Sequence, residues 1–422
     1  MVEFHDDDRQ RRNDALDASW QSLCDNLSRA SKVVSGDPRS DDPAMRAAGY
    51  RYLLNLLNAG LEQVVFSADP DYPEVGHLQD NTKRYATESP DCLFGHAVLD
   101  PAGTYRLIGT GGRARYIGLT LYDTLSLYEK TRSEGDRPTD FRAAFKAATG
   151  STLGAISNPG GITLQDNGDF EVIISARPHE GIWLPMPANT AEIITRQYFY
   201  DWDGEDPYHV SIQRIDVDGP GPVAEPVTVS TQVESVGRFV DGFAEYWATM
   251  YSLREGEPNT LRTQPTSSSS YASDGGHIAY GGGTFEIAPD EALILEVTPP
   301  ECHFWNIHLG DYWGQSLDYT YRQTSLNGHQ AVLDDDGVFR AVVAHRDPGV
   351  ANWLDTAGNT FTRCVYRWWL TTSIDLPTPT VRKVMFDDVL AELPSTTTRI
   401  DESGRRAVLA RRRAAVLKRY MR

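Results

Sequence analysis

Two long stretches of the chain repeat apolar residues at helical spacing. In residues 42–66 and again in residues 231–253, apolar side chains recur every three or four positions, which predicts helices that bury one face. Asp42 and Pro43 support a helix start in the first stretch, because aspartate caps free N–H groups and proline suits the first turn. A third, more polar helix is expected at 14–34.

Most of the remaining chain consists of short strand-like runs separated by Gly, Pro, Asn and Asp. These strands follow one another without crossover helices, which is typical of antiparallel sandwiches. The clearest runs are 104–109, 115–123, 170–176, 292–298, 303–309 and 339–345.

The two halves of the chain share an ordered set of residues. The matching pairs are Ile117 with Trp305, Asp123 with Asp311, Gly168 with Gly337, Phe170 with Phe339, Trp183 with Trp353, and Asn189 with Asn359. The spacing is 188 positions for the first two pairs and 169 or 170 for the others, so the first half carries an insertion of about 19 residues. Self-similarity that keeps its order over helix, strand and loop indicates an internal duplication.

These patterns predict a mainly β protein with flanking helices, of the α+β class. It would consist of two tandem related units, each a helix leading into an antiparallel, jelly-roll-like β-sandwich. The first unit is expected at 41–228, with its insertion at about 124–165, and the second at 229–395. Residues 1–40 would form an N-terminal helix and residues 396–422 a basic C-terminal helix.

Composition and charge exclude several classes of protein. The chain has 40 Lys+Arg against 59 Asp+Glu, and its formal net charge of −19 argues against nucleic-acid binding. The acidic first residues do not resemble a secretion signal, and no apolar run approaches the ~18 residues of a membrane span. The four cysteines lie far apart, so we expect a soluble, cytoplasmic protein with free thiols. The sequence is compatible with a homo-oligomer.

The C-terminal tail differs in charge from the rest of the chain. Residues 404–422 contain eight basic residues and no acidic one. Because these eight charges are part of the total of −19, the remaining chain carries −27. Complementary charge therefore favours an amphipathic helix docked on the acidic body over a basic arm for nucleic acid or membrane.

Part of the second half resembles the DUF1214 (domain of unknown function 1214) family. The residues that carry the resemblance are the runs 304–309, 321–327, 334–337 and 345–359, with Arg367 and Trp368. The similarity is best over 280–395. It implies a jelly-roll-like sandwich in a two-part architecture with helices, and it implies neither an activity nor catalytic residues.

Comparison of the two halves indicates where a site was built in one copy only. Alternate residues of a strand face opposite ways, so the apolar positions shared by both copies mark the core face. On other positions the second copy has polar groups where the first has small or inert ones. The differing pairs are Asn306 with Gly118, His308 with Thr120, His345 with Ala176, and Asp355 with Pro185.

We therefore predict an acid–base site in the second half. Imidazole titrates near neutrality and a carboxylate can orient it, so His308, His345 and Asp355 are the expected catalytic residues. Arginine side chains and an aromatic wall would bind the substrate. The expected binding residues are Asn306, Tyr312, Arg346, Asn352, Trp353 and Arg367. The corresponding function is a cofactor-independent hydrolase or lyase that acts on a cyclic, carbohydrate-like or hydrophobic small molecule.

A non-catalytic binding or structural protein is the alternative. In that case Asn352 and Asp355 only brace a tight loop through side-chain-to-backbone hydrogen bonds. No cofactor is expected, and the glycine-rich runs lack the residues of a phosphate-binding loop. The chain also has no nucleophile elbow. No metal site is predicted either, although a metal site formed by His308, His345 and a carboxylate is kept as an alternative.

Overall fold

The computed structural model describes residues 6–123, 152–264, 277–371, 373 and 375–420. Its longer helices are α1 (Asp6–Ser35), α2 (Pro43–Leu61), α5 (Pro226–Arg254) and α7 (Glu402–Arg419). Short helical segments are η1 (Pro38–Asp41), the π-helical η2 (Glu62–Phe66), η4 (Phe386–Asp388) and α6 (Val389–Glu392). No helix within these ranges is both long and apolar enough to cross a bilayer.

The first unit is a sandwich of two sheets. Its strands are β1 (Gly76–Gln79), β2 (Cys92–Val98), β3 (Tyr105–Thr110), β4 (Tyr116–Tyr122), β5 (Thr152–Ser157), β6 (Phe170–Ser175), β7 (Trp183–Pro185), β8 (Glu192–Tyr198) and β9 (His209–Arg214). The larger sheet has the order β1-β2-β8-β4-β5 and the smaller one β7-β6-β3-β9. Most of the predicted insertion, residues 124–151, lies outside the described residues.

The second unit has the same architecture. Its strands are β10 (Thr260–Thr263), β11 (His277–Glu286), β12 (Glu291–Val297), β13 (Cys302–Gly310), β14 (Ser325–Asn327), β15 (Phe339–Ala344), β16 (Trp353–Asp355), β17 (Phe361–Thr371) and β18 (Thr380–Met385). The order β10-β11-β17-β13-β14 forms the larger sheet and β16-β15-β12-β18 the smaller one.

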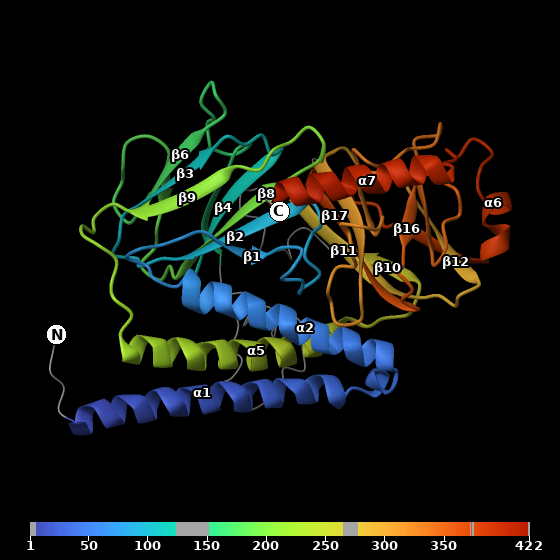
Figure 1. The fold of residues 1–422 in the computed structure, drawn as a ribbon. Coiled ribbons are helices and arrows are strands. Elements are labelled where there is room, and N and C mark those ends of the chain that lie inside the picture. Colours follow the sequence, from blue (N-terminus) through green and yellow to red (C-terminus); the bar gives the residue numbers. More distant parts are fainter. Residues whose placement is uncertain (1–5, 124–151, 265–276, 372, 374, 421–422) are drawn as a thin grey trace.

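Strand order and register confirm the internal duplication. Both pairs of sheets are ordered alike, and each unit has one parallel pair among antiparallel ones. In that pair Leu184 lies beside Ile174, and in the second unit Leu354 lies beside Val343. A mainly β fold with flanking helices and two related units is therefore what the structure shows (Figure 1).

Each sandwich buries an apolar core between its own larger and smaller sheet. Ile117, Leu119 and Leu121 of β4 are fully buried in the first core. The matching β13 positions 305, 307 and 309 line the second core. Because neighbouring strand residues face opposite ways, the other face of each larger sheet points away from its sandwich.

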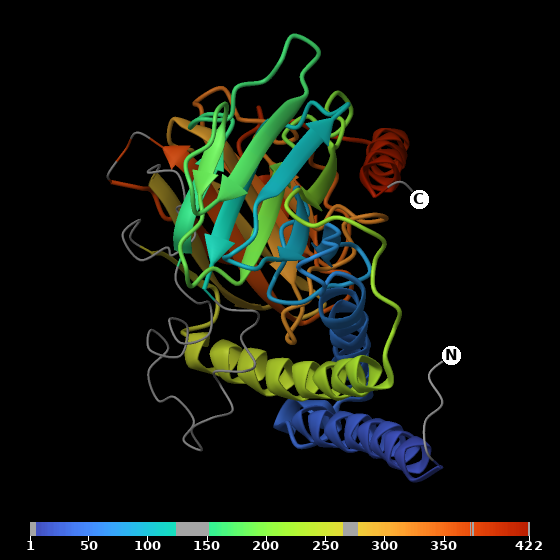
Figure 2. The same ribbon diagram turned by 90° about the vertical axis from the view of Figure 1, so that its left-hand side faces the viewer.

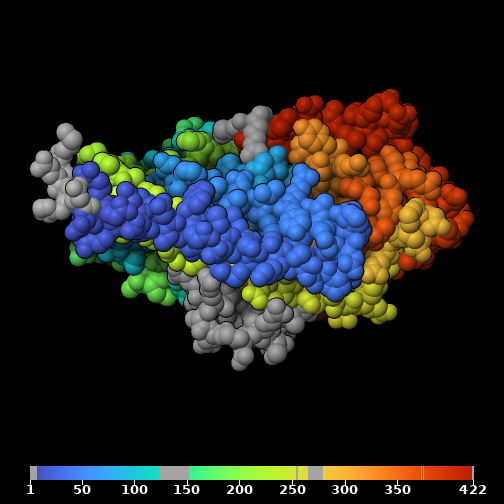
Figure 3. Space-filling view, turned by 60° about the horizontal axis from the view of Figure 1, so that its bottom comes forward, coloured from blue at the N-terminus to red at the C-terminus, as the bar shows by residue number. Residues whose placement is uncertain are grey.

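Three long helices form a layer below the sandwiches (Figures 1 and 2). Asp42 caps α2 through the Ala44 N–H, with Pro43 in the first turn, as the sequence predicts. Gly60 allows α2 to approach α5, since a Cβ there would lie 3.0 Å from the Phe239 ring. The outer surface of this layer is formed by α1 and α2 (Figure 3).

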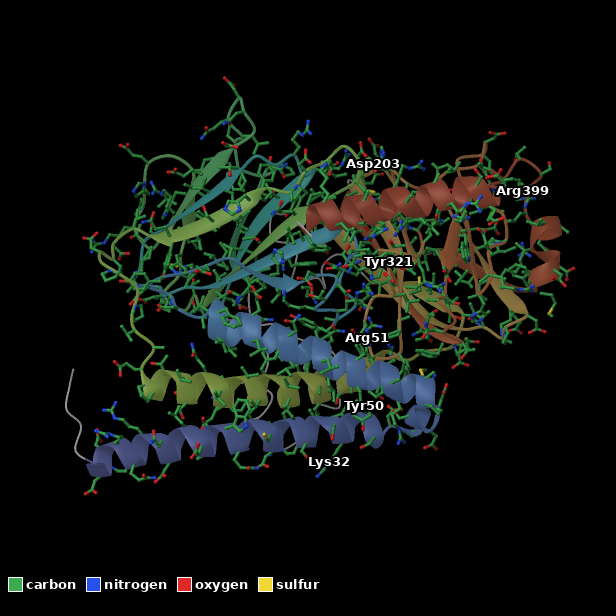
Figure 4. All side chains as sticks on the ribbon, in the orientation of Figure 1. Lys32, Tyr50, Arg51, Asp203, Tyr321 and Arg399 are labelled. Carbon is green, nitrogen blue, oxygen red and sulfur yellow. The ribbon has the colours of Figure 1, made fainter. Side chains whose placement is uncertain are left out.

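The C-terminal helix α7 lies across both units, beside the sandwiches and apart from the three-helix layer (Figures 1 and 2). Arg405, Arg412 and Arg419, which we call the arginine row, are spaced by seven residues, and all three are buried. On the flanks of this helix, Arg411 approaches Asp203 and Arg413 lies over Tyr321; both partners are labelled in Figure 4.

The arginine row contacts the two units in turn. Arg405 pairs with Asp347 of the second unit (2.9 Å), while Arg419 donates to the Pro90 carbonyl of the first. Between them, Arg412 donates to Ser325 Oγ (2.6 Å) and stacks over Trp202. The structure thus shows the basic helix docked on the acidic body.

Candidate functional site

The two larger sheets face each other across the boundary between the units. At one end their outer faces touch through aromatic side chains. Tyr198 of the central strand β8 lies 4.7 Å from Trp369 of the central strand β17 and 5.1 Å from Phe304, measured between ring centroids. These rings and Tyr116 are almost fully buried, so this end is closed to water.

A carboxylate joins the units beside the aromatic end. Asp91, which has no exposed surface, accepts hydrogen bonds from Asn306 Nδ2 (2.7 Å), Asn327 Nδ2 (2.8 Å) and Trp202 Nε1 (2.8 Å). Two of these donors belong to the second unit and one to the first. Asn306 therefore acts here as a clamp between the units.

The two central strands carry equivalent arginines on the facing sheets. In the first unit Arg196 lies between Phe94 and Gly118 on the neighbouring strands. In the second unit Arg367 lies between Tyr280 and Asn306 in the same way. Both arginines are only 6% exposed. The duplication has thus placed one buried guanidinium on each side of the boundary.

Arg196 is held by hydroxyl groups of β4. Its Nη1 donates to Thr120 Oγ1 (3.0 Å) and its Nη2 to the Tyr122 hydroxyl (2.8 Å). Burial opposes the charge of Arg196, yet its tyrosine neighbours raise its pKa above the ordinary value. The guanidinium therefore stays charged in the folded protein.

Arg367 has a poorer set of partners. Its Nη1 donates to His308 Nδ1 (3.3 Å) and its Nη2 to the Thr87 carbonyl (3.4 Å). Nε has no acceptor, and no carboxylate lies within ion-pair distance among the residues that the structure describes. Burial raises the pKa of the Tyr280 hydroxyl, whereas the charges of Arg367 and Arg196 and a hydrogen bond with Arg367 lower it, so both cations lie near this hydroxyl.

His308 is a neutral hydrogen-bonding group in this position. It has no exposed surface, and its Nε2 lies 3.3 Å from the Thr87 carbonyl. Burial, together with the charge of Arg367, lowers the pKa of His308 well below its ordinary value. Because Nε2 faces an acceptor and Nδ1 faces a donor, both ring nitrogens are occupied.

Several residues on the facing sides of the two larger sheets are only partly buried. Ile194 and Val365 occupy the middle strands β8 and β17, yet both are only partly buried. Phe94, Tyr280 and Gly282 on the adjoining strands are also partly exposed. A mid-sheet residue keeps exposed surface only where the facing sheet does not cover it. We call this region, with Arg196 and Arg367 at its border, the inter-sheet site.

A histidine–carboxylate pair lies on the same face of the first unit. His96 Nε2 is 2.8 Å from Glu192 Oε2, and His96 is 3% exposed. His96 Nδ1 is buried and has no hydrogen-bond partner. His96 pairs in register with Ile194, one of the two partly exposed central residues.

The structure brings three of the predicted site residues together and places the others elsewhere. Asn306, His308 and Arg367 share the outer face of the larger second sheet. His345 and Asp355 lie on or beside the smaller sheet, where the core separates them from His308. No hydrogen bond joins these two residues to His308 within the described chain.

The remaining predicted residues have local structural partners. His345 bonds to Thr356 Oγ1 (2.7 Å) and the Ile287 carbonyl (3.0 Å), whereas Asp355 accepts from Arg322 (2.8 Å). The others are found as follows: Asn352 donates to the Val332 and Arg340 carbonyls, Trp353 lies under Arg405, Arg346 lies over Phe386, and the Tyr312 hydroxyl donates to Asp37. Their roles in catalysis or binding stay predictions.

Further candidate ligand-binding features are a surface groove and the metal-ligating side chains. A shallow groove of about 450 Å³ lies between α2 and the edge of the second unit and is lined by Arg39, Glu286, Phe361 and Lys383 among others. Its cations already pair with neighbouring carboxylates, as Lys383 does with Glu291 (2.9 Å). No cluster of three metal-ligating side chains occurs among the described residues.

One protein-family model matches part of this chain. Residues 286–372 match DUF1214, a protein family of unknown function. The matched residues lie within the second unit. This confirms the resemblance that the sequence indicated, and it places Arg367, Asn306 and His308 inside the matched region and Arg196 and His96 outside it. No curated protein matches the chain in sequence.

Two solved structures align with most of this chain. An uncharacterized protein from Burkholderia cenocepacia has 28% sequence identity and a TM-score of 0.75, over 89% of this chain and 99% of that one. The VPA0106 protein from Vibrio parahaemolyticus has 12% identity and a TM-score of 0.42, over 85% and 100% of the two chains. The first match shows that the fold extends well beyond the DUF1214 region.

Sequence reasoning missed the half of the site that lies before the DUF1214 region. Arg196 escaped notice because it lies 171 positions before Arg367, one more than the spacing of 170 that joins Trp183 with Trp353. A buried arginine inside an apolar strand was nevertheless a visible signal. The pairing of His96 with Glu192 had no sequence signal, because 96 residues separate them.

Proposed function

We propose that this protein binds a small carboxylate-bearing molecule in the inter-sheet site. The observation that carries the proposal is the environment of Arg367. A guanidinium has five N–H donors; Arg367 donates to His308 and the Thr87 carbonyl in hydrogen bonds of 3.3 and 3.4 Å and also bonds to the Tyr280 side chain, but its buried Nε has no acceptor. These lengths exceed the usual range for N–H···O bonds.

A bound anion would complete this environment. A buried charge is costly unless it is paired and hydrogen-bonded, and no described carboxylate pairs with Arg367. A ligand carboxylate can accept two parallel hydrogen bonds from one guanidinium, including one from Nε. The ligand would therefore supply the missing counter-charge.

The surrounding residues suit a ligand with an apolar body. Tyr280 and Phe94 flank the two arginines in register, and Ile194 and Val365 provide aliphatic surface between the sheets. Binding sites of this kind are mainly apolar with a few polar groups that fix orientation. We infer an aromatic or branched carboxylate of low molecular mass.

Of the two functions considered from the sequence, binding has more support from this geometry. Acid–base catalysis by His308 would need a free ring nitrogen, and both nitrogens are engaged. It would also need His345 and Asp355 nearby, and they lie beyond the second core. The hydrolase or lyase centred on these three residues stays a prediction.

A thermal-shift screen tests the proposal. Carboxylates such as benzoate, phenylacetate and 2-oxo acids should be compared with their neutral amides, since a ligand that prefers the folded state raises the melting temperature. We expect carboxylates alone to stabilise the protein, and we expect Arg367→Met to lose this response while remaining folded.

The matched control is Arg382→Met, which removes a half-exposed arginine of β18. This variant should keep the full response. Equal stabilisation by the amides, a response that survives Arg367→Met, or no response across the panel would each refute the proposed function.

A further inference from the structure

We propose that His96 and Glu192 make the inter-sheet site a proton-transfer centre, in which His96 Nδ1 removes a proton from the bound carboxylate ligand. The inference rests on the proposed function and adds a reaction to it. It concerns a pair of residues in the first unit, outside the DUF1214 region.

The dyad has the geometry of an oriented base. Glu192 Oε2 lies 2.8 Å from His96 Nε2, which fixes the proton on Nε2 and leaves the lone pair of Nδ1 free. Nδ1 is buried without any partner, although such atoms are almost always hydrogen-bonded in folded proteins. An unpartnered ring nitrogen held by a carboxylate is therefore available to a ligand proton.

Register places a cation opposite this base. Ile194 pairs with His96 on one side and with Thr120 on the other. Arg196 donates to Thr120 Oγ1 and the Tyr122 hydroxyl, so its guanidinium reaches back along β4 toward the same row. Strands lie ~4.8 Å apart, so the backbones of His96 and Thr120, on either side of Ile194, are roughly 10 Å apart.

This spacing suits a small acid whose carboxylate pairs with Arg367, as proposed above, and whose carbonyl oxygen lies on the β4 side beside Arg196. The reacting C–H, on the carbon beside a carbonyl group, would then point toward β2. His96 Nδ1 takes the proton, the C–H electron pair stays on the ligand as an enolate, and Glu192 stabilises the imidazolium. Arg196 stabilises the negative charge on the ligand oxygen. Return of the proton completes an exchange or isomerisation without any further reactant.

The dyad was built in one copy only. By strand pairing, the second unit has Gly282 at the position of His96 and Arg363 at the position of Glu192. The shared scaffold thus requires neither group. At Gly282, which is partly exposed, the second unit has no side chain where the first has an imidazole.

Deuterium exchange tests the proposal without knowledge of the natural substrate. The probe is 2-oxobutyrate, whose C3 protons are acidic, and its exchange in D₂O is followed by proton NMR. We expect the wild type to accelerate exchange above the buffer rate, His96→Gln to abolish the acceleration, and Glu192→Gln to reduce it at least tenfold. His209→Gln, an exposed histidine of β9, is the control and should exchange like the wild type.

Two further measurements separate this proposal from the binding proposal. Thermal shift with 2-oxobutyrate should give the same stabilisation for the wild type and His96→Gln; stabilisation of the wild type without accelerated exchange overturns the proton transfer and leaves binding intact. If no carboxylate binds at all, the proposed function itself fails. In addition, ¹⁵N NMR of the His96 ring should show the proton on Nε2 in the free protein, and a proton on Nδ1 would overturn the inference.

Discussion

Replacing Glu88 by glutamine is expected to stabilise the protein at neutral and alkaline pH. Glu88 is 3% exposed and lies in the segment whose neighbours Thr87 and Asp91 bind the second unit. Its Oε2 accepts the Ser316 N–H (3.2 Å), while Oε1 has no partner. Burial raises the pKa of Glu88 to about 8, against a smaller lowering by Arg84.

The pH dependence of this effect follows from the linkage between proton binding and folding. The ordinary pKa of this carboxyl is 4.5, so between pH 4.5 and about 8 the folded state holds a proton that the unfolded chain has released. Stability therefore falls as the pH rises through this window. Each pKa unit of difference corresponds to ~1.4 kcal/mol. Burial of Glu88 therefore lowers the free energy of unfolding by about 3 kcal/mol at pH 7 and by about 5 kcal/mol above pH 8.

The amide of Glu88→Gln avoids this loss because it never ionises, and its carbonyl can still accept the Ser316 N–H. Urea unfolding of both proteins at pH 5, 7 and 8.5 measures the difference in free energy of unfolding. The free energy of unfolding of the variant, relative to that of the wild type, should increase from pH 5 to pH 7 and again from pH 7 to pH 8.5. Glu171→Gln, an exposed acid of β6, makes the same change in charge and should show no such trend. A difference for Glu88→Gln that does not change with pH would refute the assigned burial of the charge.

Three further perturbations test the contacts between the units. Asp91→Ala should destabilise the protein by about 3 kcal/mol or more in urea unfolding, because three buried donors lose a charged acceptor; retention of wild-type stability would contradict this. Arg405→Ala should cost about 2–3 kcal/mol and speed amide exchange in α7, as its bonds to Asp347 and Gln323 are lost; unchanged exchange would show that the arginine row does not hold the helix. Trp369→Ala should cost about 3–5 kcal/mol by leaving a cavity at the aromatic end, measured by thermal and urea unfolding, and a cost near zero would mean that the sheets do not pack there.

The periodic elements could be predicted closely from the sequence. The run 42–66 corresponds to α2 with η2, and the run 231–253 lies within α5. The predicted strands at 104–109 and 339–345 coincide with β3 and β15 to within one residue at each end. Local pattern suffices here because burial of one face sets the period of each element.

The packing of the two units against each other could not be predicted from the sequence. The sequence indicated that Asn306 and His308 face away from the second core, which the structure bears out. It did not indicate what that face meets. His345 was grouped with them because its counterpart Ala176 differs as theirs do, yet it lies at the smaller sheet. A difference between copies locates a changed position but carries no information on distance.

The duplication explains why the inter-sheet site lies where it does. The inner face of each larger sheet must stay apolar in both copies, since it closes a core, and this keeps residues such as Leu119 and Ile307 alike in character. The outer faces of the two larger sheets meet at the boundary between the units, so the equivalent arginines of the two copies, Arg196 and Arg367, both lie at that boundary. Two like charges in one buried region disfavour association unless an anion lies between them. Retention of both arginines at the boundary is therefore better explained by a shared ligand than by packing, and the Arg367→Met variant should fold at least as stably as the wild type without ligand.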